Sequence, residues 1–378
     1  MSDHIGGGRT LLERLIRERR QTLEEFVDFA EVFARENGEV GTLSLRHLRR
    51  LVSGNRGDGR PLGRVTMATA RLLERIFEVP VSDLLAPPAC ATDEDLCRQF
   101  DVAGRIDESI IAIFRRQLDT LRRLDRQMGA PLAYEEVVAK IAQIRWLLSR
   151  SLSSTIRTEL SIILAELCAL AGWQALDMGR LAEAWEHHAN GRSVAVEDGL
   201  DSFEAHTAGE QAFVLLDLGR TADALAALSS AIHTGVRSAP HLRAWLLGAI
   251  GEAHAADGHR TASLRAFDAA SALLPADSDT SAGPYVALDD AHLTRWRGHA
   301  LARLGDPEAV AVLSDALNRH DMSFARAETG LRVDLAAALT SAGRHDEARP
   351  HLARAGGLAR TIGSVRQTRR ITAIRLGG

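Results

Sequence analysis

Six arginines lie within 21 residues, in the segment SLRHLRRLVSGNRGDGRPLGR at positions 44–64, where the only acid is Asp58. Guanidinium groups bind phosphate through paired N–H donors, so this cluster suits a nucleic-acid backbone. Between Gly41 and Arg75, eight arginines face two acids, a local balance of +6, whereas the whole chain carries −4. A basic patch on an acidic chain indicates a small DNA-binding module attached to a larger domain. The alternative is a solvated helix face without a partner.

Composition excludes several other classes of protein. The 378 residues are 46% apolar, 25% charged and 4% aromatic, and no apolar run reaches about 18 residues. The first ten residues, MSDHIGGGRT, lack the apolar segment of a secretory signal. Cys90, Cys97 and Cys168 form no CxxC pair, so neither a disulfide framework nor a zinc site is expected. We expect a cytoplasmic protein of two or three domains with no membrane contact.

Enzyme motifs are missing from the sequence. There is no GxSxG, no GxxxxGK[ST] and no GxGxxG after a strand, and the GGG at residues 6–8 lies in a polar tail. Fourteen histidines include no HExxH or paired His–carboxylate spacing. We therefore expect no catalytic residues, no metal and no cofactor.

The hydrophobic spacing of residues 1–86 predicts five short helices, at 10–21, 22–34, 44–52, 67–77 and 82–85. Thr22 and Glu25 form the pattern of a capping box at the start of the second helix. In the third helix, an apolar stripe is expected to face the core and the remaining side chains to project outward. The stripe is Leu45, Leu48, Leu51 and Val52.

This five-helix pattern, with a basic third helix and the closing segment VPVSDLL, resembles the phage-repressor (XRE-type) helix-turn-helix domain. The resemblance implies that the third helix lies in the major groove of DNA. The positions it implies for base contact are Thr42, Ser44, Arg46, His47 and Arg49. Those it implies for phosphate contact are Arg50, Arg56, Arg60 and Arg64. Two segments are longer than in that family, the link RENGEVGT and the loop NRGDGRPLGRV, which is expected to act as a wing.

Residues 87–150 are expected to be a helical linker after a hinge at Ala86-Pro-Pro-Ala89. A long helix is predicted over 104–128, with a stripe broken by Asp125. Two interpretations of that stripe remain open: packing against the next helix of the chain, at 137–148, or a dimer seam. The stripe consists of Ile111, Phe114, Leu118, Leu121 and Met128.

Residues 151–378 repeat a short pattern five times. The motifs DMGRLAEA, DLGRTADA, ADGHRTAS, RLGDPEAV and SAGRHDEA place glycines at Gly179, Gly219, Gly258, Gly305 and Gly343. A small residue precedes each glycine by seven positions and another follows it, which predicts helical hairpins with closely approaching helices. The preceding set is Gly172, Ala212, Gly251, Gly298 and Ala336, and the following set is Ala184, Ala224, Ser263, Ala309 and Ala348.

This pattern resembles the tetratricopeptide repeat over roughly 220 residues, and the third unit matches it best. The spacings between successive turn glycines are 40, 39, 47 and 38 residues. They exceed the usual 34, so linkers such as ADSDTSAG (276–283) are extended. The resemblance implies an α-solenoid with a concave face. Consensus positions in the third unit are occupied by Leu247, Ile250, Gly251, His254, Ser263, Phe267, Ala270 and Pro275.

On this register the first helix of each hairpin contributes to the concave face. Aromatic rings mixed with charge suit a peptide or small-molecule pocket, and the alternative is packing between repeats. The candidate effector-binding residues are Glu166, Trp173, His206, Phe213, Trp245, Glu252, His292, Arg295 and His299.

The expected fold is all-α, with a helix-turn-helix domain (1–86), a linker and possible dimerisation region (87–150) and a repeat domain (151–378). This order resembles bacterial regulators in which a peptide-sensing repeat domain controls DNA binding, the RRNPP group. The resemblance implies a homodimeric transcriptional regulator that binds double-stranded DNA and senses a peptide, a small molecule or a protein partner. The alternative is a tetratricopeptide adaptor with a degenerate helix-turn-helix module.

Overall fold

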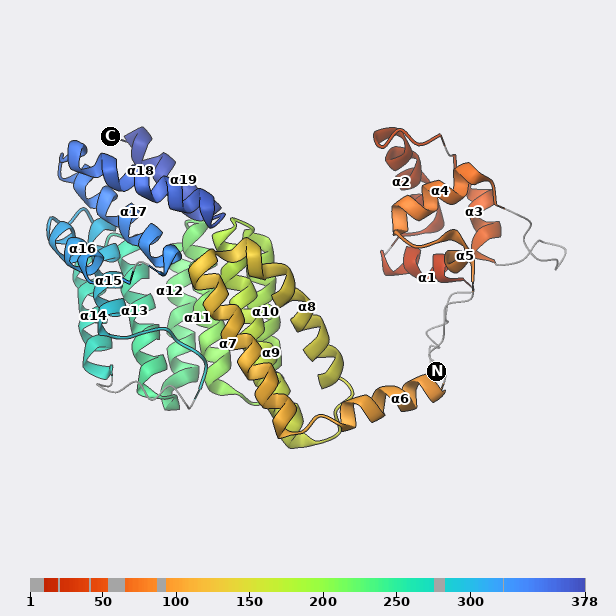
Figure 1. The fold of residues 1–378 in the computed structure, drawn as a ribbon, viewed down its shortest axis with the longest axis horizontal. Helices are drawn as coiled ribbons and strands as arrows, with labels where there is room; N and C mark the ends of the chain where they lie inside the picture. The colour runs from red at the N-terminus through yellow and green to blue at the C-terminus, as the bar shows by residue number, and fades with distance from the viewer. Residues whose placement is uncertain are drawn as a thin grey trace. The chain divides into compact units, whose positions relative to one another are not determined.

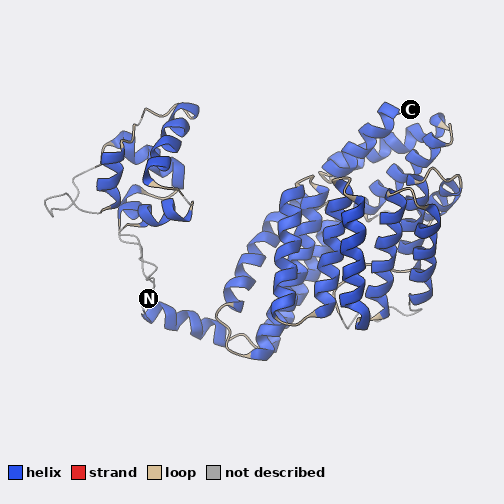
Figure 2. Ribbon diagram, turned by 180° about the vertical axis from the view of Figure 1, so that it is seen from behind, coloured by secondary structure: helices blue, strands red, loops and turns tan. Residues whose placement is uncertain are grey.

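The computed structural model describes residues 10–19, 21–40, 42–53, 65–86, 93–274, 283–321 and 323–377. These residues form nineteen α-helices and one short 3-10 helix, and they contain no strand (Figure 2). The expected all-α class is therefore confirmed for the described chain. The chain divides into two compact units, Met1–Arg98 and Gln99–Gly378.

The first unit packs five helices around one apolar core. Leu12, Phe26, Leu48 and Leu84 come from four of these helices and are fully buried in that core. The helices are α1 (Leu11–Glu18), α2 (Leu23–Glu36), α3 (Leu45–Val52), α4 (Met67–Phe77) and α5 (Val81–Leu85). The five helices lie where the hydrophobic spacing predicts them.

Side-chain caps define where these helices begin. The first four each start after a Ser or Thr whose hydroxyl accepts a hydrogen bond from the backbone N–H three residues on. At α2 the predicted capping box is present, because Glu25 also accepts from the Thr22 backbone N–H at 2.7 Å. The four caps are Thr10, Thr22, Ser44 and Thr66.

Three helices precede the repeats: α6 (Asp93–Gly104), α7 (Glu108–Met128) and α8 (Ala130–Leu148). The prediction missed α6, and it began α8 seven residues late. Gly129, at φ +89°, ends α7, and Pro131 fits the first turn of the next helix because its fixed φ suits that position.

The apolar stripe of α7 packs inside its own unit. Ile111, Leu118 and Leu121 are buried against α8 and α9. The expectation of packing against the next helix is thus confirmed, and the dimer-seam alternative is wrong for these side chains because the same chain covers them. Met128, expected in the stripe, is 52% exposed, whereas Asp125 is buried.

Five helical hairpins follow, and Figure 1 shows their helices side by side through the second unit. Ser154–Asp177 (α9) is long and apolar enough to cross a membrane, yet 78% of its apolar window is buried inside the unit. The hairpins are α9 with α10 (Leu181–Glu197), α11 (Asp201–Asp217) with α12 (Thr221–Thr234), α13 (Pro240–Ala256) with α14 (Arg260–Leu273), α15 (Asp290–Arg303) with α16 (Glu308–Asn318), and α17 (Ala325–Ser341) with α18 (His345–Thr361).

The five repeated glycines form the hairpin turns. All five have φ between +67° and +76°, the left-handed region in which a side chain is strained. Each follows the last residue of a first helix by two positions. The glycine pattern therefore located all five turns correctly.

The small residues sit where paired helices touch. A Cβ built at Gly172 would lie 2.4 Å from the His188 ring, and one at Gly251 would lie 2.6 Å from the Phe267 ring. The five small residues after the turns are likewise buried, none more than 2% exposed. The expectation that these positions permit close helix approach is confirmed.

The two ends of the hairpin array meet within the second unit. A Cβ at Gly129, between α7 and α8, would lie 2.2 Å from the Ile362 carbonyl oxygen. One at Gly363, before the last helix α19 (Val365–Gly377), would lie 2.5 Å from Pro131. The α7–α8 turn thus packs directly against the α18–α19 turn. In Figure 1, the turn between α18 and α19 lies on the side of α7 and α8, and α19 runs from there back to the C-terminus.

Candidate functional site

The third helix, α3, presents its polar face outward. Leu48, Leu51 and Val52 are buried, whereas Arg46, Arg49 and Arg50 are exposed. Leu45 is half-buried at the edge of the stripe. A continuous arginine face on a short helix can bind phosphate or base edges. The predicted orientation of α3 is confirmed.

Some of the predicted contact residues already have partners. Arg49 donates to Glu24 of α2 at 2.6 Å, and both side chains are more than half exposed. An exposed pair of this kind contributes little free energy, so a phosphate can replace Glu24. Ser44 caps α3 by accepting from the His47 backbone N–H at 3.3 Å. Thr42 is exposed.

His47 is half-buried beside these arginines. Burial lowers its pKa, and the positive charge of Arg50 lowers it further. A neutral imidazole offers one donor and one acceptor, which suits a base edge better than a phosphate.

The other predicted phosphate contacts, Arg56, Arg60 and Arg64, lie outside the described residues. Two more arginines of the basic region have an internal role. Arg75 donates to Glu39 at 2.5 Å, and Arg71 lies 3.3 Å from the same carboxylate. These ion pairs hold α4 against the link that leads into α3, so part of the local positive charge is structural.

In the second unit, aromatic rings from successive first helices form one stack. Trp173 of α9 lies edge-on to Phe213 of α11, with ring centres 5.9 Å apart. Phe213 also lies 5.9 Å from Trp245 of α13 and 5.8 Å from Trp296 of α15. Aromatic pairs at these separations stabilise packing. Contacts between hairpins therefore account for these rings without a ligand.

Glu166 is buried against α7 and the segment before α15. It forms an ion pair with Arg122 of α7 and accepts from the Tyr285 backbone N–H at 2.6 Å. The Arg122 guanidinium lies 4.3 Å from the centre of the Tyr285 ring. Burial lowers the pKa of Arg122 to about 10. The segment at Tyr285 thus covers this part of the interior.

A second polar cluster joins α13, α15 and α17. His299 lies between two carboxylates, with its Nδ1 2.7 Å from Asp334 and its Nε2 3.3 Å from Glu252. Burial alone would lower the pKa of His299, but these two carboxylates outweigh it and raise that pKa. Burial likewise acts against ionisation of Glu252, yet His299 and the Trp296 N–H hold its pKa at about 2. The imidazolium therefore donates to both acids.

The remaining candidates are held by near neighbours. His206 lies 3.5 Å from Glu210 and its ring centre 5.0 Å from that of Trp245. His292 contacts its own helix cap, Asp289, at 2.7 Å. Burial lowers the pKa of Arg295, and Asp334 and Asp289 act in the opposite direction.

The nine candidate effector residues thus lie in the interior of the hairpin array, where several of them contact one another. Five are buried and four are half-buried, and protein atoms surround them. Their assignment to an effector stays a prediction. The buried members are Glu166, His206, Phe213, Trp245 and Glu252, and the half-buried ones are Trp173, His292, Arg295 and His299.

Sequence reasoning missed the arginine–carboxylate pairs that cross this interior. Arg326 of α17 donates to Asp125 at 2.7 Å and to Asp177 at 3.2 Å. Arg366 of α19 makes a two-point contact with Asp217, at 2.7 and 2.8 Å. Both Asp177 and Asp217 precede a turn glycine by two positions, so their place in the repeat was a visible signal.

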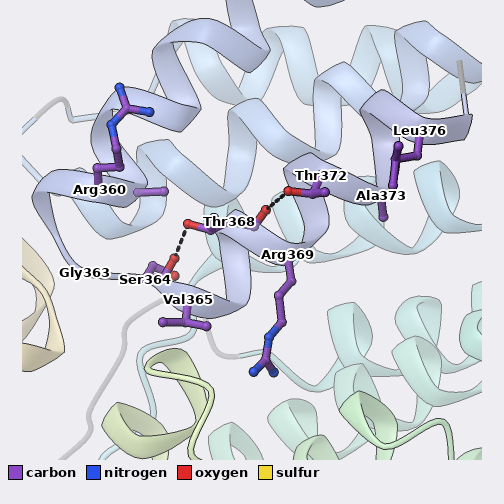
Figure 3. A pocket seen from close by; sticks show the side chains of 10 residues that line it. Arg360, Gly363, Ser364, Val365, Thr368, Arg369, Thr372, Ala373 and Leu376 are labelled. Carbon is purple, nitrogen blue, oxygen red and sulfur yellow. Dashed lines mark hydrogen bonds between the residues drawn. The ribbon is translucent and has the colours of Figure 1, made fainter.

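An open groove of about 520 Å³ lies between α18 and α19 (Figure 3). Figure 3 shows the Thr368 hydroxyl donating to the Ser364 carbonyl and the Thr372 hydroxyl donating to the Thr368 carbonyl. The groove therefore offers mainly apolar contacts, with Arg360 and Arg369 at its sides.

Within the described ranges we find neither a metal-binding cluster nor a disulfide. Among the described residues, no three His, Cys, Asp or Glu side chains cluster in a way that could hold a metal ion. Cys97 and Cys168 are free thiols, and burial raises the pKa of Cys168 to about 12. Cys90 lies outside the described ranges.

No protein-family model matches the chain, and no curated protein matches it at a significant level.

Proposed function

We propose that the chain is a sequence-specific DNA-binding transcriptional regulator in which α3 reads DNA. The observation that carries the proposal is the exposed arginine face of α3, formed by Arg46, Arg49 and Arg50 over a buried apolar stripe. It agrees with the resemblance of the first five helices to a phage-repressor helix-turn-helix domain. As a cytoplasmic homodimer, such a protein would bind two half-sites about one DNA turn apart.

The hairpin array is the proposed regulatory part. Its turns, small positions and stacked first helices agree with a tetratricopeptide-like solenoid, in which neighbouring units bury each other's apolar faces. We propose that it binds a peptide, a small molecule or a protein partner and thereby changes the DNA affinity of the first unit. An effector achieves this only if it binds two arrangements of the chain with different affinity.

The test begins with selection of genomic DNA fragments by the purified full-length protein. The strongest fragment is then used to compare wild type with Arg46→Ala/Arg50→Ala. We expect the variant to lose specific binding and to show a shallower dependence of affinity on salt, since two phosphate or base contacts are gone. Arg349→Ala, an arginine 77% exposed on α18, is the matched control. Equal binding by all three proteins would overturn the assignment of α3.

A protein-interaction adaptor is the second candidate. Two observations favour it: eight residues separate α2 from α3, and Arg49 is paired with Glu24. An adaptor would select no DNA fragment at any salt concentration, and it would still bind its partner when Arg46 and Arg50 are alanine.

A further inference from the structure

The last helix, α19, has two different faces. Arg366, Gln367, Arg370, Ile371 and Ile374 face the interior of the hairpin array and are buried or half-buried. The opposite face is exposed and borders the groove of Figure 3. The inner face places two arginines four residues apart, one helical turn.

Those two arginines bind carboxylates from two different hairpins. Arg366 pairs with Asp217 of α11, and its guanidinium lies 5.7 Å from the Trp173 ring of α9. Arg370 donates to Asp334 of α17 at 2.5 Å. A planar guanidinium matches both a carboxylate and an aromatic face, so the Arg366 site, which offers both, suits arginine, and the Arg370 site offers the carboxylate.

Apolar side chains contribute less to the packing of α19 than these ion pairs do. Of its side chains, Ile371 is buried and Ile374 is half-buried against the last hairpins. Buried ion pairs add little net stability, because desolvation offsets the attraction, but removing one partner is costly. A helix held in this way is readily exchanged for another that supplies the same guanidinium groups.

We propose that α19 is an exchangeable occupant of the array interior, and that its sites at Asp217 and Asp334 accept an arginine-bearing helix from another polypeptide. The partner is a basic helical segment with arginines four residues apart. Its binding displaces α19 and separates the first hairpin from the last. The inference rests on the proposed effector role of the array and names the class of effector.

The first test measures peptide binding to the full-length chain. The probe is a fluorescent peptide of residues 363–377, and the readout is its anisotropy. Wild type binds weakly, because α19 competes at the effective concentration of a tethered segment. Arg366→Ala/Arg370→Ala vacates both sites, so we expect it to bind the peptide about tenfold or more tightly.

Two controls separate site occupancy from charge. Arg369→Ala/Arg375→Ala removes the same charge from exposed positions of α19, and we expect it to bind the peptide as wild type does. A peptide with alanine at the positions of Arg366 and Arg370 should bind neither protein. Equal affinity of both peptides for the vacated variant, or no gain over wild type, would overturn the proposal.

A second measurement uses wild type alone and does not depend on how the variants fold. Hydrogen exchange should show α19 amides opening at lower free energy than those of α17 and α18, with further loss of protection when peptide is added. Exchange of all three helices at one common free energy, unchanged by peptide, would make α19 a fixed structural cap.

Failure of this proposal is distinct from failure of DNA binding. The peptide experiments contain no DNA and change no residue of the first unit. DNA selection with Arg46→Ala/Arg50→Ala leaves α19 intact, so each result bears on one proposal alone.

Discussion

At the scale of single residues, the interior of the hairpin array depends on charged side chains that pair with one another away from the surface. His299 shows this most clearly, because both of its ring nitrogens face carboxylates of other helices, Glu252 and Asp334. The imidazolium and the two acids stabilise one another only while all three are charged. The cluster therefore makes the stability of the second unit depend on pH.

We expect the stabilisation by His299 to decline as the pH rises. Its pKa is raised in the folded state, so its contribution is complete below the ordinary value of 6.5 and is lost as the pH passes the raised value. The measurement is the difference in free energy of unfolding between wild type and His299→Gln, by urea titration from pH 5.5 to 9. The difference should be largest at pH 5.5.

The exposed His233 of α12, changed to Gln, serves as the control for that experiment. A difference between wild type and His299→Gln that grows with pH would contradict the assignment of a charged imidazole between the two acids.

At the scale of helices, glycine and other small residues determine how closely paired helices approach. Gly172 of α9 faces His188 of α10, whose ring is fully buried. Burial lowers the pKa of His188 to about 4, so the ring is neutral near pH 7 and behaves as a packing group. The α9–α10 hairpin has no room for a further methyl group at this contact.

Gly172→Ala should therefore lower the free energy of unfolding by about 1–3 kcal/mol, because the new Cβ overlaps the His188 ring. Gly357→Ala is the matched control: nothing lies within 4 Å of its Cβ position in α18, and alanine favours a helix. We expect that variant to be more stable than wild type by up to about 1 kcal/mol. Chemical denaturation of both variants checks the contrast, and equal effects would refute it.

The local pattern of the sequence predicted these elements well. Turn glycines, small positions and the Thr22–Glu25 cap depend on neighbours a few residues away, so their spacing identifies them. The ion pairs of Arg326 and Arg366 join residues about 150 to 200 positions apart. No local period encodes which acid an arginine meets, so the sequence could not reveal that the interior is occupied by α7 and α19.

The sequence also could not predict that the candidate effector residues are buried. Trp173, Phe213 and Trp245 were placed correctly on the first helices of their hairpins, but whether they face a ligand or one another depends on the spacing between hairpins. In the structure their rings touch one another. α6 was missed because its segment follows a Pro-Pro pair that suggested a hinge.

At the scale of the whole molecule, each of the two compact units buries apolar side chains of its own. Leu48 of α3 is fully buried in the first of them, and the arginine face of the same helix depends on its packing. A change in one core should therefore leave the other unit intact.

Leu48→Ala should destabilise the first unit by about 2–5 kcal/mol through the cavity it leaves. Calorimetry should show that transition shifted to lower temperature, while the transition of the second unit stays where it is in wild type. Leu228→Ala, fully buried in α12, should do the reverse. A shift of both transitions by either variant would show that the two units unfold together.

The contact of Gly129 with Ile362 and of Gly363 with Pro131 also limits how such a chain can evolve. An open array of hairpins can gain or lose a copy, because each unit touches only its neighbours. Here the α18–α19 turn must meet the α7–α8 turn, and a duplicated hairpin would carry it past that meeting point. The number of hairpins is therefore fixed at five. Related chains have to diverge by substitutions within the hairpins and not by gaining or losing a hairpin.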